Sequence, residues 1–212
     1  RPLHVFDADK IVGDIKVRMA KQGENIIGID GREYNLDSEM TVIADENCVG
    51  SIAGVMGGMA SGCTQETVNV FIEAALFDPI QTSTTGRKLN LQSDARFRFE
   101  RGIDSHFLEP GIQIATGLII DICGGEASKI ISVGVASDRC DSISFRPSRV
   151  RGLAGVDVEQ DEMRRILEVL GFKVFGTGNK WDVSVPTWRN DIIGEACLVE
   201  EIIRVYGYDK IP

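Results

Sequence analysis

The first third of the chain shows the alternation of apolar and polar side chains that is typical of β-strands. Between residues 14 and 21, Ile15, Val17 and Met19 alternate with charged residues, which predicts a half-buried strand. Further strands are predicted at residues 26–29, 33–36, 40–44, 51–55 and 68–75. Asp30-Gly31 lies between the first two of these strands and predicts a tight hairpin turn whose central positions both have positive φ.

After residue 79 the apolar positions recur with the longer period of helices. Helices are predicted at residues 80–89 and 105–123, and a strand is predicted at residues 129–135. Asp104 or Ser105 is a candidate cap for the second helix, which Gly124-Gly125 ends. The polar stretch at residues 136–142 is the predicted domain boundary.

The last third is a shorter succession of strands and helices. It comprises a strand at residues 143–146, an amphipathic helix at 160–170 capped by Gly171, a hairpin of 173–175 with 181–185, and a helix at 192–206. The pattern predicts an α+β protein with two domains. Residues 1–138 form a mixed or antiparallel sheet with flanking helices, and residues 142–212 form a small, winged-helix-like domain of helices and a hairpin.

Composition narrows the class of protein further. The chain is 43% hydrophobic and 26% charged, as in ordinary globular proteins. Its best apolar run, residues 118–123, is short and interrupted by Asp121, so we expect no membrane span. The net charge of -9 argues against a protein that binds nucleic acid by general phosphate attraction, although it allows one local basic patch.

The cysteines and the first residue of the chain lead to two further predictions. Five cysteines without a CxxC pair, in a chain with two histidines, favour reduced thiols over a zinc site. The chain opens on Arg1 and shows no signal peptide, so we expect a segment of a longer polypeptide.

Two features of the first domain are candidates for ligand binding. The run AGVMGG (residues 53–58) allows a backbone to approach a ligand, but it lacks the spacing of phosphate-binding loops. From spacing alone, a tight turn is the better interpretation. Glu73 lies in the apolar run VFIEAALF (residues 70–77), where a carboxylate is costly to bury without a partner. It is either the solvent-facing end of a strand or a hydrogen-bond acceptor in a pocket.

Two charged segments also invite a functional interpretation. RFRFER (residues 96–101) lies in a stretch where basic side chains outnumber acidic ones. It predicts either a half-buried strand with a charged outer face or a surface for a single-stranded RNA end. Asp191, Glu200 and Glu201 lie at and within the last helix, with Cys197 nearby. They indicate a Mg²⁺ site or, more simply, a solvated acidic helix surface.

Seven sequence blocks occur in a familiar order. They are RPLHVFD (1–7), VIAD (42–45), IAGVMGG (52–58), EAALFDP (73–79), RFERGID (98–104), VPTWRND (185–191) and LVEEIIRVYGYDKIP (198–212). In order and spacing, these blocks resemble the beta subunit of bacterial phenylalanyl-tRNA synthetases. The resemblance covers essentially the whole chain, which starts inside that family's editing domain.

The resemblance implies an editing function for the first domain, which in the family hydrolyses tyrosine mischarged onto phenylalanine tRNA. The matching pocket positions are His4, Gly54, Gly57, Glu73, Ser93 and Ala95. Glu73 is expected to accept a hydrogen bond from the tyrosine hydroxyl. His4 and Ser93 are expected to position water or the terminal ribose, not to abstract a proton. Arg96 and Arg98 are the candidate RNA contacts.

For the second domain, the resemblance implies a role in subunit assembly and a Mg²⁺ site shared with the alpha subunit, at Asp191, Glu200 and Glu201. Cys197 replaces an aspartate expected there, and a thiol is a poor ligand for Mg²⁺. The family assembles as two alpha and two beta chains in the cytoplasm. ATP and aminoacylation belong to the alpha subunit, so neither is expected of this chain, and editing requires no cofactor.

Some residues depart from the family pattern, and other functions remain open. Gln92 and Phe97 stand where many members have histidine, which argues against a histidine-dependent mechanism. A structural or tRNA-docking module without editing activity is the main alternative, in which Arg96 and Arg98 matter and Glu73 does not. A stand-alone amino-acid-binding protein is disfavoured by the match of the second domain.

Overall fold

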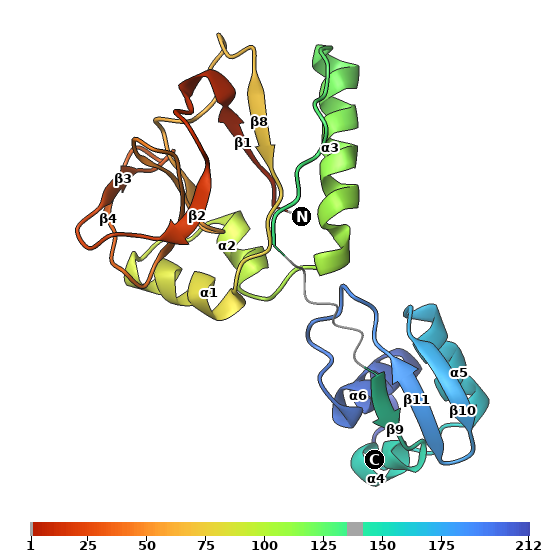
Figure 1. Ribbon diagram of the computed structural model, residues 1–212. Helices are drawn as coiled ribbons and strands as arrows, with labels where there is room; N and C mark the ends of the chain where they lie inside the picture. Colours follow the sequence, from red (N-terminus) through yellow and green to blue (C-terminus); the bar gives the residue numbers. More distant parts are fainter. Residues whose placement is uncertain (1, 135–141) are drawn as a thin grey trace. The chain divides into compact units, whose positions relative to one another are not determined.

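The computed structural model describes residues 2–134 and 142–212 and divides the chain into two compact units, residues 1–136 and 137–212 (Figure 1). Both units combine antiparallel strands with helices, so the predicted α+β class is confirmed. The domain boundary predicted at residues 136–142 falls almost entirely on residues outside those described.

The first unit is built around antiparallel strands. They are β1 (His4–Asp7), β2 (Lys16–Met19), β3 (Asn25–Ile27), β4 (Glu33–Asn35), β5 (Thr41–Ala44), β6 (Val49–Ile52), β7 (Met56–Gly57) and β8 (Val70–Glu73). One sheet has the order β2-β5-β6-β7, while β1 pairs with β8 and β3 pairs with β4. The core between them contains the fully buried side chains of Leu36, Val42, Ile52 and Val55. For most of these strands, the predicted ends lie within three residues of the observed ends.

Helices follow the strands in this unit. They are η1 (Ala8–Lys10), α1 (Pro79–Lys88), α2 (Asp94–Phe99), η2 (Ser105–Phe107) and α3 (Leu108–Cys123). The Asp78 side chain accepts a hydrogen bond from the backbone N–H of Gln81 and caps α1, which begins with Pro79. The RFRF segment lies in α2, so its interpretation as a strand is wrong. Helix α3 has no buried residue, although much of its surface is apolar.

Two local predictions in the first unit are corrected by the structure. Residues 129–134 contain no strand, and Val135 lies outside the described residues. In the β3–β4 turn, Gly31 has a φ of +78°, whereas Asp30 does not have positive φ. The turn is therefore not the predicted one with two left-handed positions. Asp30 instead accepts hydrogen bonds at its side chain from Arg32 N and Tyr34 Oη.

The second unit has its own core. Its elements are β9 (Ser142–Phe145), α4 (Ser148–Ala154), α5 (Gln160–Val169), β10 (Lys173–Thr177), β11 (Lys180–Ser184), α6 (Glu195–Tyr206) and η3 (Tyr208–Lys210). The strands pair antiparallel in the order β10-β11-β9, and α4 and α5 pack against α6. Trp181, Phe145, Leu198 and Ile202 are buried in the centre. Helix α4 was not predicted, and α6 begins three residues later than predicted.

The structure also bears on membrane association and on the thiols. Within residues 2–134 and 142–212, no helix combines the length and apolar character needed to cross a membrane. The thiols of Cys48, Cys63, Cys123 and Cys197 are free, and Cys140 lies outside the described residues.

Candidate functional site

A cavity of about 420 Å³ opens in the first unit, in the size range of small-molecule sites. We refer to it as the inner cavity. All six pocket positions expected from the sequence line it: His4, Gly54, Gly57, Glu73, Ser93 and Ala95. Apolar side chains make up much of the remaining wall, among them Leu3, Val55, Met56, Phe77 and Phe99. Residues from widely separated parts of the unit's sequence, between residues 2 and 99, thus meet around one space.

The β1–β8 ribbon contributes a histidine and a glutamate to the inner cavity. His4 and Glu73 are directly opposed in the antiparallel register, so their side chains project from the same face. Burial raises the pKa of Glu73 to about 7 and lowers the pKa of His4. Near neutral pH, His4 is therefore uncharged, and Glu73 exchanges between a carboxylate and a neutral acid.

In the part of the chain that the structure describes, each of these side chains has a polar group without a protein partner. Nε2 of His4 is buried without a hydrogen-bond partner in the described part of the chain. The carboxyl group of Glu73 has no hydrogen bond or ion pair to any residue that the structure describes, and burial raises its pKa. Unsatisfied polar groups beside an apolar cavity indicate a ligand with hydrogen-bonding groups at those positions.

The glycine run brings bare backbone to the cavity wall. A Cβ on Gly57 would lie 2.2 Å from Cε1 of His4, so the imidazole packs directly on this glycine. Gly54 has a φ of +71°, and a Cβ there would lie 3.0 Å from Phe77. The glycines are thus required by close approach at one position and by backbone conformation at the other. The sequence alone favoured an ordinary turn for this run.

Helix α2 supplies Ser93 and Ala95 to the inner cavity. The Ser93 hydroxyl donates a hydrogen bond of 2.5 Å to the Val55 carbonyl and accepts one of 3.1 Å from the backbone N–H of Arg96. It caps α2 and ties this helix to the glycine run. Because its proton is engaged by a carbonyl, Ser93 is suited to positioning and not to nucleophilic attack.

Asp30 is a cavity residue that the sequence analysis assigned only to a turn. It lines the inner cavity, and its carboxylate accepts a hydrogen bond of 2.6 Å from Tyr34 Oη. That hydrogen bond is the main cause of the lowered pKa of Asp30. Asp30 therefore carries a negative charge at the cavity wall near neutral pH. A tyrosine four residues after a turn aspartate was the available signal for this contact.

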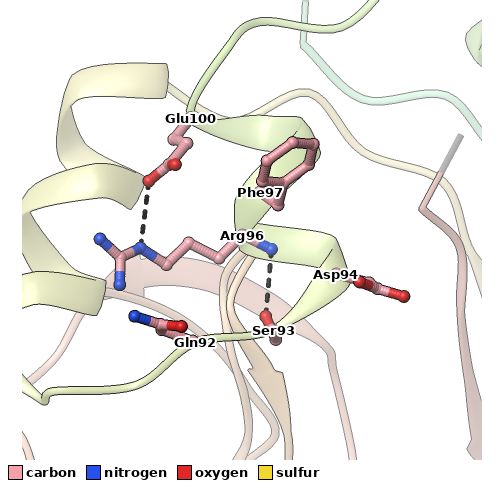
Figure 2. Close-up of a pocket in the computed structure, with 6 residues that line it drawn as sticks. All are labelled: Gln92, Ser93, Asp94, Arg96, Phe97 and Glu100. Carbon is pink, nitrogen blue, oxygen red and sulfur yellow. Dashed lines mark hydrogen bonds and ion pairs between the residues drawn. The ribbon is translucent and has the colours of Figure 1, made fainter.

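A second, open cavity of about 470 Å³ borders the other side of α2, and we call it the outer cavity. Its lining residues are Gln92, Ser93, Asp94, Arg96, Phe97 and Glu100 (Figure 2). Ser93 lines both cavities. Figure 2 shows the Arg96 side chain extended toward Glu100 and the Asp94 side chain directed away from both.

The two arginines expected to contact RNA have different surroundings. The Arg96 side chain is only 14% exposed, packs over Gly86, and donates to the Leu91 carbonyl and to Glu100. The Arg98 side chain is 52% exposed and donates to the Asp94 carbonyl. Arg98 lies 4.0 Å from the Asp94 carboxylate but is accessible to a phosphate, whereas Arg96 joins α2 to α1.

The carboxylates of the second unit are occupied by arginine. Nη2 of Arg189 lies 2.7 Å from Oδ2 of Asp191 and 2.9 Å from Oε1 of Glu201. Arg204 contacts the other oxygen of Glu201 at 2.6 Å, and Glu200 is exposed. Among the described residues, no group of three or more metal-binding side chains is close enough to hold an ion. This arrangement does not fit Mg²⁺, because arginine already occupies the carboxylate oxygens of Asp191 and Glu201.

Comparison with known proteins defines the class to which the chain belongs. Residues 1–124 match the family model described as the B3/4 domain, and residues 143–208 match that of the tRNA synthetase B5 domain. The chain belongs to the B3/4 domain family, because that match covers more than half of its length.

Relatives are similar over the whole chain. It is 53% identical to the phenylalanine–tRNA ligase beta subunit of Paramagnetospirillum magneticum and 51% identical to that of Bradyrhizobium diazoefficiens. All 212 residues align, but they span only 27% and 26% of those proteins. The resemblance to this beta subunit is thus confirmed for a segment of it. A crystal structure of an N-terminal fragment of the phenylalanyl-tRNA synthetase beta subunit from Pyrococcus horikoshii is similar at a TM-score of 0.48 and 17% identity, over 97% of this chain and 60% of that chain.

Proposed function

We propose that the first unit is a proofreading module that hydrolyses the ester of tyrosine mischarged onto phenylalanine tRNA. The observation that carries the proposal is Glu73, an unpaired carboxyl group in the apolar wall of the inner cavity. The similarity to phenylalanine–tRNA ligase beta subunits supports the choice of substrate.

The inner cavity has the composition needed to prefer tyrosine over phenylalanine. The two amino acids differ by one hydroxyl group, which an apolar pocket cannot strongly exclude. A pocket with a buried polar partner discriminates better, because phenylalanine leaves that partner unsatisfied. Glu73 is such a partner in either protonation state, since its carboxylate accepts from a phenol and its acid form can also donate.

Positioning, and not proton abstraction, is the role that the remaining residues fit. His4 is uncharged and has a free Nε2 beside Gly57, so it can orient water or a ribose hydroxyl. The hydroxyl of Ser93 is held by Val55 and Arg96. The ribose hydroxyl next to the ester in the substrate itself is then the natural group to assist the attacking water.

The second unit is proposed to support assembly with the synthetase alpha subunit. Its match to the tRNA synthetase B5 domain supports this role. Its ion pairs from Arg189 to the exposed Asp191 and to the buried Glu201 stabilise the unit internally. ATP-dependent aminoacylation is assigned to the alpha subunit.

The test is hydrolysis of tyrosyl-tRNA and phenylalanyl-tRNA by the complete synthetase that contains this chain. Glu73→Ala is expected to reduce the preference for the tyrosyl ester by roughly tenfold or more, the effect of losing one buried hydrogen-bond partner. Glu73→Gln, which keeps an acceptor of similar size, is expected to retain part of the preference. Unchanged discrimination in Glu73→Ala would contradict the assignment.

A docking function without hydrolysis is favoured by one observation, the exposure of the Arg98 side chain on α2. If this were the function, Arg98→Ala would weaken tRNA binding and make its salt dependence shallower, while Glu73→Ala would have no effect. The two variants, measured in the same binding and hydrolysis assays, separate the two functions.

A further inference from the structure

The inner and outer cavities share Ser93, and this shared wall restricts how a substrate larger than an amino acid can lie. An aminoacyl-tRNA has its amino-acid side chain on one side of the ester and its terminal nucleoside on the other. An amino acid beside Glu73 in the inner cavity would place the ester near Ser93, and the nucleoside would then continue into the outer cavity.

Phe97 gives the outer cavity an aromatic surface. This side chain is 56% exposed and lies on the lining of the outer cavity, so its ring is within reach of a ligand there. The guanidinium of Arg101 lies 3.7 Å from the centre of its ring. Arg101 does not line the cavity, whereas Phe97 does, so the arginine stacks on the ring without closing the space. The ring is thereby held in place and remains accessible.

The charges around the outer cavity favour a neutral ligand over a phosphate. Arg96 is paired with Glu100, donates to the Leu91 carbonyl and is largely buried. The carboxylate of Asp94 is almost fully exposed at the rim. Gln92 adds a side-chain amide, which both donates and accepts hydrogen bonds. An aromatic ring and an amide, with no unpaired cation on the lining, suit the face and edge of a nucleobase.

We propose that Phe97, backed by Arg101, is the stacking platform for the terminal nucleobase of the aminoacyl-tRNA whose amino acid occupies the inner cavity. This inference rests on the proposed function and specifies its second subsite. Phe97 positions the ester by holding the base, so its loss is expected to raise KM more than it lowers kcat. Stacking depends on an aromatic face and not on apolar volume, which makes leucine and tryptophan informative replacements.

The experiment compares wild type, Phe97→Leu and Phe97→Trp in the complete synthetase, with tyrosyl-tRNA as substrate. A second substrate has the same tRNA with an abasic terminal ribose, which keeps the ester and removes the base. With the normal substrate, Phe97→Leu is expected to raise KM roughly tenfold, in the range for one lost base–aromatic stack, and Phe97→Trp is expected to restore it. With the abasic substrate, the leucine variant and wild type are expected to behave alike.

Phe175→Leu is the matched control, because this phenylalanine is 57% exposed and lies in the second unit on β10. Its KM is expected to equal that of wild type. If the base stacks on Phe97, removing the base and replacing Phe97 must have coupled effects on KM. Effects of the two changes that multiply independently in KM would overturn the proposal. An equal KM for Phe97→Leu and wild type would overturn it as well. If wild type does not hydrolyse tyrosyl-tRNA at all, the proposed function itself fails, which is a distinct result.

Discussion

At the scale of single residues, Glu73 links the candidate site to stability. Its pKa rises from an ordinary value of 4.5 to about 7 on folding, because burial disfavours the charged form. The folded state therefore binds the proton more tightly than the unfolded state. The resulting stability is fully present below pH 4.5 and is lost as pH rises through 7. Over that window the loss is on the order of 3 kcal/mol.

Glu73→Gln removes this titration and is expected to flatten the pH dependence. The free energy of unfolding of the variant, relative to wild type, is predicted to rise between pH 5 and pH 8 by up to about 3 kcal/mol. Urea titrations followed by circular dichroism at several pH values provide the measurement. The exposed Glu66→Gln serves as the matched control for the replacement of a glutamate. If the difference for Glu73→Gln does not change with pH, its carboxyl group is solvated.

Gly57 is the residue where space, and not backbone conformation, limits substitution. It does not have positive φ, so alanine fits the backbone, but the new Cβ would lie 2.2 Å from the His4 ring. Gly57→Ala is therefore predicted to displace His4 and to lower the rate of tyrosyl-tRNA hydrolysis by roughly tenfold or more. Gly152→Ala, with no atom within 4 Å of its added Cβ, is expected to leave the rate unchanged. Full activity of Gly57→Ala would mean that the position of His4 does not matter.

At the scale of elements, the contact between α1 and α2 depends on one glycine. A Cβ on Gly86 would lie 2.3 Å from Cδ of Arg96, whose guanidinium is fixed by the Leu91 carbonyl and Glu100. Alanine has a higher helix propensity by about 1 kcal/mol, but a clash in a packed contact costs about 1–3 kcal/mol. We therefore predict that Gly86→Ala is destabilising overall, as measured by urea unfolding.

Gly117→Ala in α3 isolates the propensity effect, because nothing lies within 4 Å of its added Cβ. This variant is expected to be neutral or stabilising. The double variant of Gly86→Ala with Arg96→Ala is expected to lose less stability than the sum of the single changes, since the clash is gone. If the losses of unfolding free energy in the two single variants simply add in the double variant, the contact between Gly86 and Arg96 is not the cause of the destabilisation.

The same elements show what the sequence could and could not predict. Strands β2 and β5 were found because alternation is a local signal. Helix α2 was ambiguous because the alternating arginines and phenylalanines of its six residues mimic a strand, and the serine cap at Ser93 was not used. Residues 129–134 are apolar enough for a strand, but a strand also needs a pairing partner, which the described residues do not give them. Helix α4 contains Gly152 and has no side-chain cap, so it left no clear signal.

For the candidate site, the sequence identified the residues but not the contacts between them. The resemblance identified the residues that line the inner cavity, since the blocks that carry them are local in sequence. It did not reveal that Glu73 faces His4, that Asp30 joins the wall, or that Ser93 borders two cavities. These facts depend on strand register and on contacts between segments far apart in the chain. Cys197 raised a doubt about the metal site, but only the structure shows that Arg189 bridges Asp191 and Glu201.

At the scale of the whole molecule, the two units have separate hydrophobic cores, so each has its own source of stability. Both tryptophans, Trp181 and Trp188, lie in the second unit. Tryptophan fluorescence therefore reports on the unfolding of that unit. Changes confined to the first unit, such as Glu73→Gln, are expected to shift the circular dichroism transition and to leave the fluorescence transition in place.

Arg189→Leu is the change that tests the second unit in the same experiment. Glu201 is buried, and its carboxylate is shared between Arg189 and Arg204. Removing one partner of a buried ion pair typically costs about 3–5 kcal/mol, and the remaining contact to Arg204 places the expected loss near the lower end. The fluorescence transition is predicted to move to lower urea concentration. Replacing Glu201 with Gln in the same background is expected to recover part of the loss, because it removes the poorly compensated charge. No shift in Arg189→Leu would mean that Arg204 alone satisfies Glu201.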